Sequence, residues 1–291
     1  MADFLCLLTA AIWGTGFIAS QAAIDAHMSP ALIMVIRFTV ASLVMGIFAI
    51  KRLKTINLQV IKAGLLPGLF LFGAFYAQIL GQERTTVSHC AFLTATNVVM
   101  VPFLEWAASR HRPPVRTFMI TLLTFIGVGI LSIAPGSFSL TFNLGDGLSL
   151  LCALLFALHI ASVGRAVQKE DVVLVNLIQM VVAAIISAVL FLVTDLHALN
   201  HANLSAGLPA VLYLGLFSTC LCYFLQALAQ KYTSASQAGV LLSTEGMFAT
   251  LLSVLLGMED LTPNIVCGGL LILLSVILLE YFSAKSVHTV Q

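Results

Sequence analysis

Apolar residues in this chain gather into long runs, each about as long as an α-helix that crosses a lipid bilayer. A spanning helix needs about 20 predominantly apolar residues, so the 291 residues have room for about ten spans with short loops between them. The runs cover residues 3–23, 30–50, 62–81, 87–108, 115–134, 146–167, 173–194, 208–229, 234–256 and 263–282. Strands of a membrane β-barrel would alternate in short segments instead, so the pattern predicts an all-α polytopic membrane protein.

The joints between the runs contain residues that end helices and start new ones, and they also orient the chain. Such pairs and triplets are Ser29-Pro30, Arg112-Pro113-Pro114, Pro135-Gly136 and Thr262-Pro263. With the N-terminus in the cytoplasm, the basic residues of the inner loops and tail are Lys51, Arg52, Lys54, Lys62, Arg110, Arg112, Arg116, Arg165, Lys169, Lys231 and Lys285. The outer loops hold only Arg84. This asymmetry predicts a multi-pass protein of the bacterial inner (plasma) membrane with both termini cytoplasmic.

Composition excludes a soluble domain. Hydrophobic residues make up 60% of the chain and charged residues 9%, against about 25% charged in an average soluble domain. The first run has no basic segment before it, so we expect a retained helix rather than a signal peptide. The six cysteines all fall inside runs and form no CxxC pair, which favours buried small side chains and predicts no cofactor and no metal. A net charge of +1 gives no indication of nucleic-acid binding.

The second half of the chain repeats the first. A shift of 142 positions carries Ile18-Ala19-Ser20 onto Ile160-Ala161-Ser162 and Arg37 onto Gln179. A shift of 148 positions carries polar residues onto polar residues: Gln78 onto Gln226, His89 onto Gln237, and Asn97 onto Glu245. Each repeat holds five runs, an odd number, so the second repeat enters the bilayer from the opposite side. We predict repeats at 1–135 and 143–284 around a central cavity, followed by a cytoplasmic tail at 285–291.

Ionisable and polar groups at membrane depth are the first candidates for function. Glu245 is interpreted either as a proton carrier or partner of a substrate amine, or as a carboxyl hydrogen-bonded between helices for packing. Arg37 either binds a substrate carboxylate, or reaches the outer interface or a neighbouring helix's carbonyls. The other candidate substrate-binding residues, each with packing as its alternative role, are Trp13, Tyr76, Gln78, His89, Asn97, His159, Tyr223, Gln226 and Gln237.

Several of these segments carry a family resemblance. Trp13-Gly14-Thr15-Gly16-Phe17 resembles the Trp-Gly-x-x-Phe signature of the drug/metabolite transporter superfamily, in its ten-helix EamA-type exporter branch. Ser29-Pro30 with Arg37, Pro102, and the stretch 256–262 are similar to that family's pattern, although Gly246 follows Glu245 where members commonly have proline, and Met258 interrupts the Leu-Gly-Glu signature. The resemblance implies two inverted five-helix repeats around a substrate cavity, and export of amino acids or other small metabolites.

The predicted function is a secondary active transporter that exports amino acids or similar small amphipathic metabolites by alternating access. Proton coupling through Glu245 is an added hypothesis, and we expect a monomer. The alternative is a facilitative channel or uniporter for small solutes, although the sequence shows neither a ring of like charges nor a filter loop. An intramembrane enzyme ranks third, because HExxH is absent and the neighbours Ser88 and His89 point about 100° apart on a helix.

Overall fold

The computed structural model describes residues 1–85, 87–110, 112–132, 143–255 and 261–288, and the elements it contains there are helices. In chain order they are α1 (Ala2–Asp25), α2 (Pro30–Ala49), η1 (Leu53–Thr55), α3 (Leu58–Gln82), α4 (Val87–Thr94), α5 (Asn97–Ser109), α6 (Val115–Ser132), α7 (Leu144–Lys169), α8 (Val172–Leu190), η2 (Phe191–Asp195), η3 (Leu196–Asn200), α9 (Leu204–Tyr213), η4 (Leu214–Leu221), α10 (Cys222–Gln230), α11 (Ala235–Leu242), α12 (Glu245–Leu255) and α13 (Pro263–His288).

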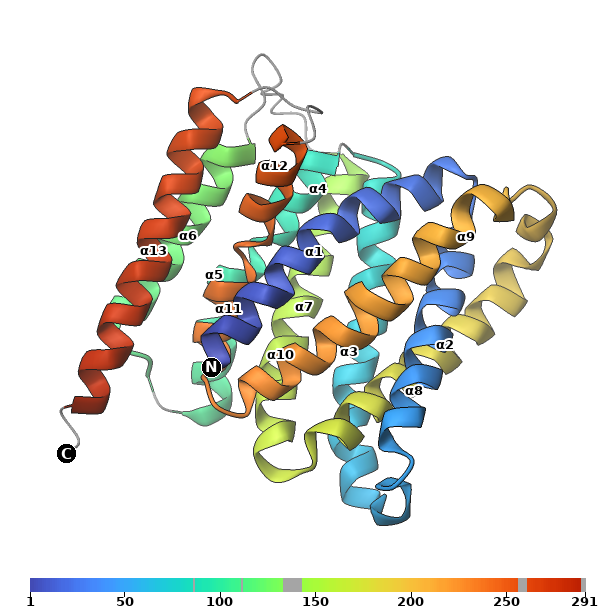
Figure 1. Cartoon of the computed structure of the whole chain (residues 1–291), viewed down its shortest axis with the longest axis horizontal. Coiled ribbons are helices and arrows are strands. Elements are labelled where there is room, and N and C mark those ends of the chain that lie inside the picture. The colour runs from blue at the N-terminus through green and yellow to red at the C-terminus, as the bar shows by residue number, and fades with distance from the viewer. Residues whose placement is uncertain (86, 111, 133–142, 256–260, 289–291) are drawn as a thin grey trace.

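Within the described residues these elements make up ten apolar segments, as the apolar runs predicted. Figure 1 shows them packed into one helical bundle. Six segments are single long apolar helices: α1, α2, α3, α7, the segment from α8 through η2, and the segment from α9 through α10. The other four are α4 with α5, α6, α11 with α12, and α13. The predicted fold class of a ten-helix membrane protein is confirmed. The predicted joint at Pro135-Gly136 and the stretch 256–260 lie outside the described residues.

Two predicted joints start helices as expected. Ser29 is the N-cap of α2, its hydroxyl accepts a hydrogen bond from the Leu32 amide, and Pro30 is the first helical residue. At the last joint, the Thr262 hydroxyl accepts from the Ile265 amide and Pro263 begins α13. Proline suits the first turn because its missing N–H would have no partner within the helix there.

The two halves run in opposite directions through the bundle. In Figure 1 the chain descends from α4 to α5, whereas it rises from α11 to α12, so that α4 and α12 lie at the upper end and α5 and α11 lower. These are the equivalent fourth helices of the two repeats. Two inverted five-helix repeats around a central cavity are therefore the architecture of this chain.

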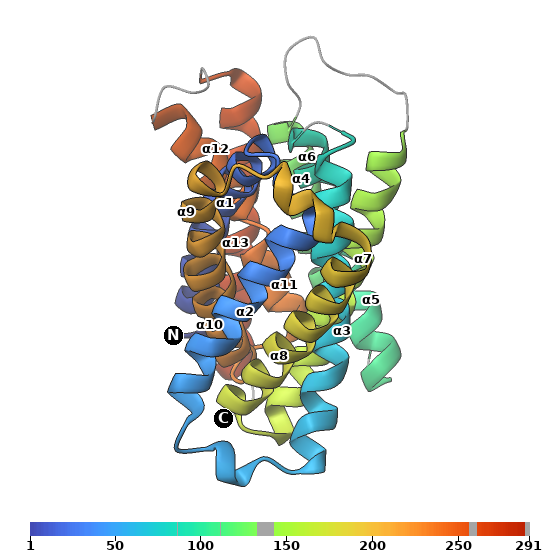
Figure 2. The same ribbon diagram turned by 90° about the vertical axis from the view of Figure 1, so that its right-hand side faces the viewer.

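Small residues hold the two halves together at short range. α3 packs along α7 and α8 (Figures 1 and 2), with Gly64 and Gly68 facing the α8 backbone so closely that a Cβ atom at either would lie about 3 Å from a carbonyl oxygen. At the other end of α3, a Cβ atom at Gly81 would likewise lie about 3 Å from the carbonyl oxygen of Gly145 in α7. In lipid, close approach of helix backbones replaces the hydrophobic drive that packs soluble helices.

The fourth and ninth segments are broken at equivalent positions. α4 gives way to α5 at Ala95–Thr96, and α11 gives way to α12 at Ser243–Thr244, and the two breaks are related by the 148-position shift. At each break a threonine hydroxyl donates to the carbonyl three residues earlier: Thr96 to Leu93 at 2.7 Å and Thr244 to Leu241 at 2.6 Å. Asn97 and Glu245 then begin the second half-helices. Broken helices at membrane depth are tolerated where they are buried in protein or line a cavity.

The eighth segment contains a π-helical stretch, η4, at its centre. The wider turn shifts the register of the side chains, and such turns frequently mark functional sites. Gly215 in this stretch allows α2 to approach closely, since a Cβ there would lie 3.0 Å from the carbonyl oxygen of Arg37. The π-helical stretch thereby comes into contact with the part of α2 that carries Arg37.

Candidate functional site

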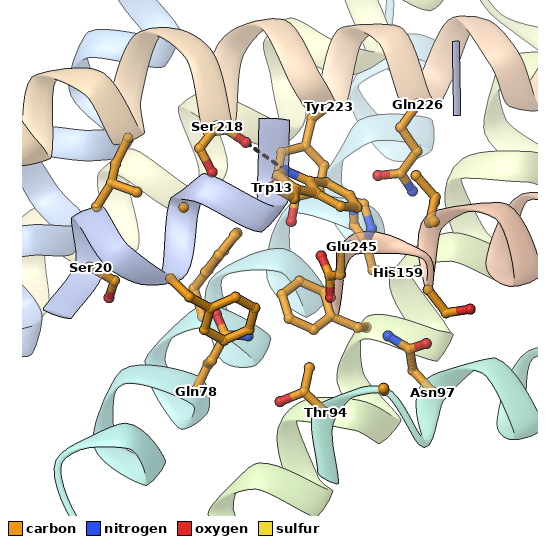
Figure 3. A pocket seen from close by; sticks show the side chains of 18 of the residues that line it. Trp13, Ser20, Gln78, Thr94, Asn97, His159, Ser218, Tyr223, Gln226 and Glu245 are labelled. Atoms are coloured by element: carbon orange, nitrogen blue, oxygen red, sulfur yellow. Dashed lines mark hydrogen bonds between the residues drawn. The ribbon is translucent and has the colours of Figure 1, made fainter. Parts of the chain in front are cut away.

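A cavity opens where the two broken helices bend, at mid-length of several of the helices that line it (Figure 3). It contains about 730 Å³ free of protein atoms, and part of this space is open to solvent. The lining residues are Trp13, Gly16, Phe17, Ser20, Arg37, Phe75, Gln78, Gln82, Thr94, Ala95, Asn97, Phe156, His159, Ile160, Leu214, Ser218, Tyr223, Gln226, Leu242, Ser243 and Glu245.

Glu245 is the first residue of α12 and lines this cavity. Within the described ranges, no group donates a hydrogen bond to its carboxyl and no cation pairs with it. The packing interpretation, a carboxyl hydrogen-bonded between helices, therefore has no counterpart in this part of the chain. The positive end of the α12 dipole offers a favourable electrostatic environment for a carboxylate. The arrangement leaves both carboxyl oxygens available to a ligand or a proton.

Arg37 contributes a positive charge to the same cavity. Its side chain is 3% exposed, so it does not extend to the outer interface. Nε donates to the Thr219 hydroxyl at 2.5 Å, Nη2 donates to the Ser218 hydroxyl at 3.4 Å, and the guanidinium carbon lies 3.7 Å from the centre of the Phe75 ring. No carboxylate within the described part of the chain forms an ion pair with Arg37. The cation is thus held by two hydroxyls and an aromatic face.

Aromatic side chains form a wall beside these charges. Trp13 and Tyr223 have ring centres 5.1 Å apart, and Phe75 contacts both Tyr223 and Phe156 edge-on at 5.9 and 5.2 Å. The Trp13 indole Nε1 donates to the carbonyl oxygen of Ser218 at 2.8 Å, which fixes its ring on the π-helical stretch. A cavity with aromatic sides and two separated charges suits a small amphipathic solute.

The structure brings most of the predicted site residues together. Trp13, Arg37, Gln78, Asn97, His159, Tyr223, Gln226 and Glu245 all line the cavity. Tyr76 does not: its ring stacks on Phe72, with centres 5.8 Å apart. Gln237 completes a capping box with Ser234 at the start of α11. The side chain of His89 lies outside the described residues.

Sequence reasoning overlooked several site residues, above all the two hydroxyls that contact Arg37: Ser218, which lines the cavity, and Thr219 beside it. Both side chains are buried, and they interrupt an otherwise apolar run. That interruption is a usable signal, because hydroxyls inside a membrane helix bond either to the backbone or to a polar partner. Ser20, Gln82 and Ser243 line the cavity as well.

Comparison with known proteins gives a consistent result. The model of the EamA-like transporter family matches residues 1–133 and 143–281. An uncharacterized transporter from Archaeoglobus fulgidus is 33% identical over 279 residues, which cover 96% of this chain and 85% of that protein. A crystal structure of another protein has the same fold, with a TM-score of 0.79 at 15% identity over 97% of this chain and 98% of that one. This chain is a membrane protein of the EamA-like transporter family.

Proposed function

We propose that this transporter is a secondary carrier that exports amino acids or similar zwitterionic metabolites. The observation that carries the proposal is the pair of opposite, unpaired charges in one cavity. Arg37 and Glu245 both line it, and neither forms an ion pair within the described residues. A charge held at membrane depth without a partner costs several kcal/mol, so such groups are kept mainly where a ligand or an ion compensates them.

A zwitterion compensates both charges at once. Its carboxylate accepts hydrogen bonds from the Arg37 guanidinium, and its ammonium donates to Glu245. The aromatic wall of Trp13, Phe75 and Tyr223 then contacts the apolar part of the solute. A metabolite with only one charge leaves one protein charge uncompensated, so we expect it to bind more weakly.

The same site suggests how transport is coupled to protons. When the ammonium leaves Glu245, a proton is the simplest group that neutralises the carboxyl in the buried cavity. Alternate occupation of Glu245 by substrate and proton exchanges one for the other across the membrane. Inverted repeats supply the conformational change, since two similar halves can exchange their conformations and open the cavity to either side. We place the protein in the plasma membrane with both termini in the cytoplasm.

Uptake of labelled amino acids into proteoliposomes tests this proposal. We expect saturable uptake, stimulated by a pH gradient in the wild type, and loss of the gradient stimulation in Glu245→Gln, because a neutral amide exchanges no proton and pairs with no ammonium. Glu170→Gln, at the end of α7 and outside the cavity, is the matched control and should transport like the wild type.

Three results would count against the proposal in different ways. If gradient-stimulated uptake is unchanged in Glu245→Gln, the hypothesis of proton exchange at this residue is rejected. Flux that rises linearly with solute concentration favours the channel alternative. Absence of uptake of any amino acid rejects the substrate class.

A further inference from the structure

Two buried acceptor atoms on residues that line the cavity have no hydrogen-bond donor within the described residues. They are Nδ1 of His159 and Oε1 of Gln226, on side chains that are each 1% exposed. Both residues line the cavity and are drawn in Figure 3 among its walls. Buried polar atoms in native proteins almost always have partners, so these two call for a donor supplied from outside the chain.

A chain of hydrogen bonds fixes His159 as an acceptor toward the cavity. The Met45 sulfur can only accept a hydrogen bond, so the Asn176 side-chain atom that lies 3.2 Å from it is the nitrogen, which donates. The Asn176 oxygen then accepts from Gln179 Nε2 at 2.6 Å, and Gln179 Oε1 faces His159 Nε2 at 2.9 Å. Nε2 therefore carries a proton, and in the neutral form of His159 the lone pair lies at Nδ1.

A second chain of hydrogen bonds fixes the orientation of the Gln226 amide. Gln230 Nε2 donates to the carbonyl oxygen of Ile160 at 2.8 Å, so its own oxygen is the atom that meets Gln226. Gln226 Nε2 donates to that oxygen at 3.1 Å. This bond fixes the orientation of the Gln226 amide and leaves its buried Oε1 without a donor within the described residues.

These acceptors lie away from the charged end of the cavity, the end at which Ser218 and Thr219 hold Arg37. Gln226 follows Ser218 by about two helical turns along the same segment, and Tyr223 lies between them in the sequence. His159 packs edge-on against Tyr223, with ring centres 5.3 Å apart. In an amino acid, carboxylate and ammonium share one carbon atom, so a substrate whose carboxylate is on Arg37 reaches this region with its side chain.

We propose that His159 and Gln226 form a subsite for a neutral N–H or O–H donor in the substrate's side chain. The inference rests on the proposed function, because it assumes that the backbone of an amino acid occupies the charged end. The donor is neutral because Glu245 is the only carboxylate among the described lining residues, and the substrate ammonium pairs with it. A second cation would be left without a counter-ion.

Binding of isosteric pairs to purified protein tests the subsite. Three pairs differ in whether the side chain carries a donor: threonine and valine, glutamine and methionine, tyrosine and phenylalanine. For the wild type we expect the donor-bearing member of at least one pair to bind about tenfold more tightly or better, the penalty expected when buried acceptors stay unpaired. The ratio should fall toward one in His159→Phe and in Gln226→Met, and persist in the exposed control Gln59→Met.

The outcomes separate this inference from the proposed function. Equal affinity within all three pairs in the wild type overturns the subsite while amino-acid binding stands, and this measurement needs no variant to fold. If the variants weaken both members of a pair equally, the acceptors bind the shared ammonium, and the side-chain assignment is wrong. If no amino acid binds at all, both the subsite and the proposed substrate class fall.

Discussion

At the scale of single residues, Arg37 is the most unusual group in the molecule. A buried guanidinium is ordinarily paired with a carboxylate, because desolvation of an unpaired charge is expensive. Here its hydrogen-bond partners are the hydroxyls of Thr219 and Ser218, which carry no compensating charge. Arg37 therefore contributes less to stability than a paired arginine would, which is why the proposed function places the carboxylate of the substrate on it.

Replacement of Arg37 should separate stability from transport. In Arg37→Met the methionine keeps an apolar contact with Phe75 and removes an unpaired charge, so we expect an unchanged or higher melting temperature together with loss of amino-acid uptake. Arg165→Met, on α7 and outside the cavity lining, is the control for removal of an exposed arginine from a membrane-spanning helix. A melting temperature lowered by many degrees in Arg37→Met would identify a structural arginine instead.

Polarity at membrane depth identified Glu245, Arg37, Gln226 and His159 from sequence, but it could not choose between neighbours. Tyr76 was a predicted substrate-binding residue, yet successive residues point about 100° apart on a helix, and it is its neighbour Phe75 that lines the cavity. Gln237 could have been assigned correctly, because Ser-x-x-Gln at the start of an apolar run is a capping-box pattern.

At the scale of helices, the ten runs predicted the spans, but not the two breaks. The fourth and ninth runs are mostly apolar across the breaks, and the threonines there, Thr96 and Thr244, have no distinctive sequence pattern. Thr121 in α6 also bonds a backbone carbonyl, four residues earlier, without ending its helix. A threonine hydroxyl competes with the backbone in all three places, and the tertiary environment decides whether the helix continues. The internal repeat located the equivalent positions without indicating that the helix bends there.

The contact between α1 and α12 gives a matched pair of glycine substitutions. A Cβ at Gly14 would lie 2.8 Å from the Ala249 amide nitrogen and 3.0 Å from the Glu245 carbonyl oxygen, so Gly14→Ala must push the two helices apart. We expect a loss of about 1–3 kcal/mol in the free energy of unfolding and weaker transport, because α12 carries Glu245. Thermal unfolding monitored by tryptophan fluorescence measures the first, and proteoliposome uptake the second.

Gly246→Ala is the control for that substitution, since nothing lies within 4 Å of a Cβ at this position. We expect it to fold with stability equal to the wild type or up to about 1 kcal/mol higher, because alanine favours a helix over glycine. A severe loss of stability in Gly246→Ala would show that the break beside Glu245 needs the conformational freedom of glycine. Equal stability of Gly14→Ala and the wild type would show that α1 and α12 can separate at no cost.

At the scale of the whole molecule, the two repeats interlock instead of standing side by side. α3 packs on α7 and α8, and α2 packs on α8 and the π-helical stretch, so each half completes the packing of the other. The cavity likewise takes one unpaired charge from each half: Arg37 from the first and Glu245 from the second. Under the proposed function, a zwitterion needs one charged group from each repeat, and a rocking motion of one repeat against the other would change the side from which the pair is reached.

The inverted architecture makes a prediction for membrane orientation, because equivalent loops of the two repeats must face opposite sides. The loop after α3 carries Arg84, and its counterpart after α10 carries Lys231; both side chains are exposed. In a background with the exposed Cys267 changed to serine, we expect Arg84→Cys to react with a membrane-impermeant maleimide on intact cells. Lys231→Cys should react only after the cells are permeabilised, since basic residues gather on the cytoplasmic side. The opposite labelling pattern would invert the proposed orientation and place the termini outside, whereas labelling of both cysteines from one side would contradict the inverted repeat itself.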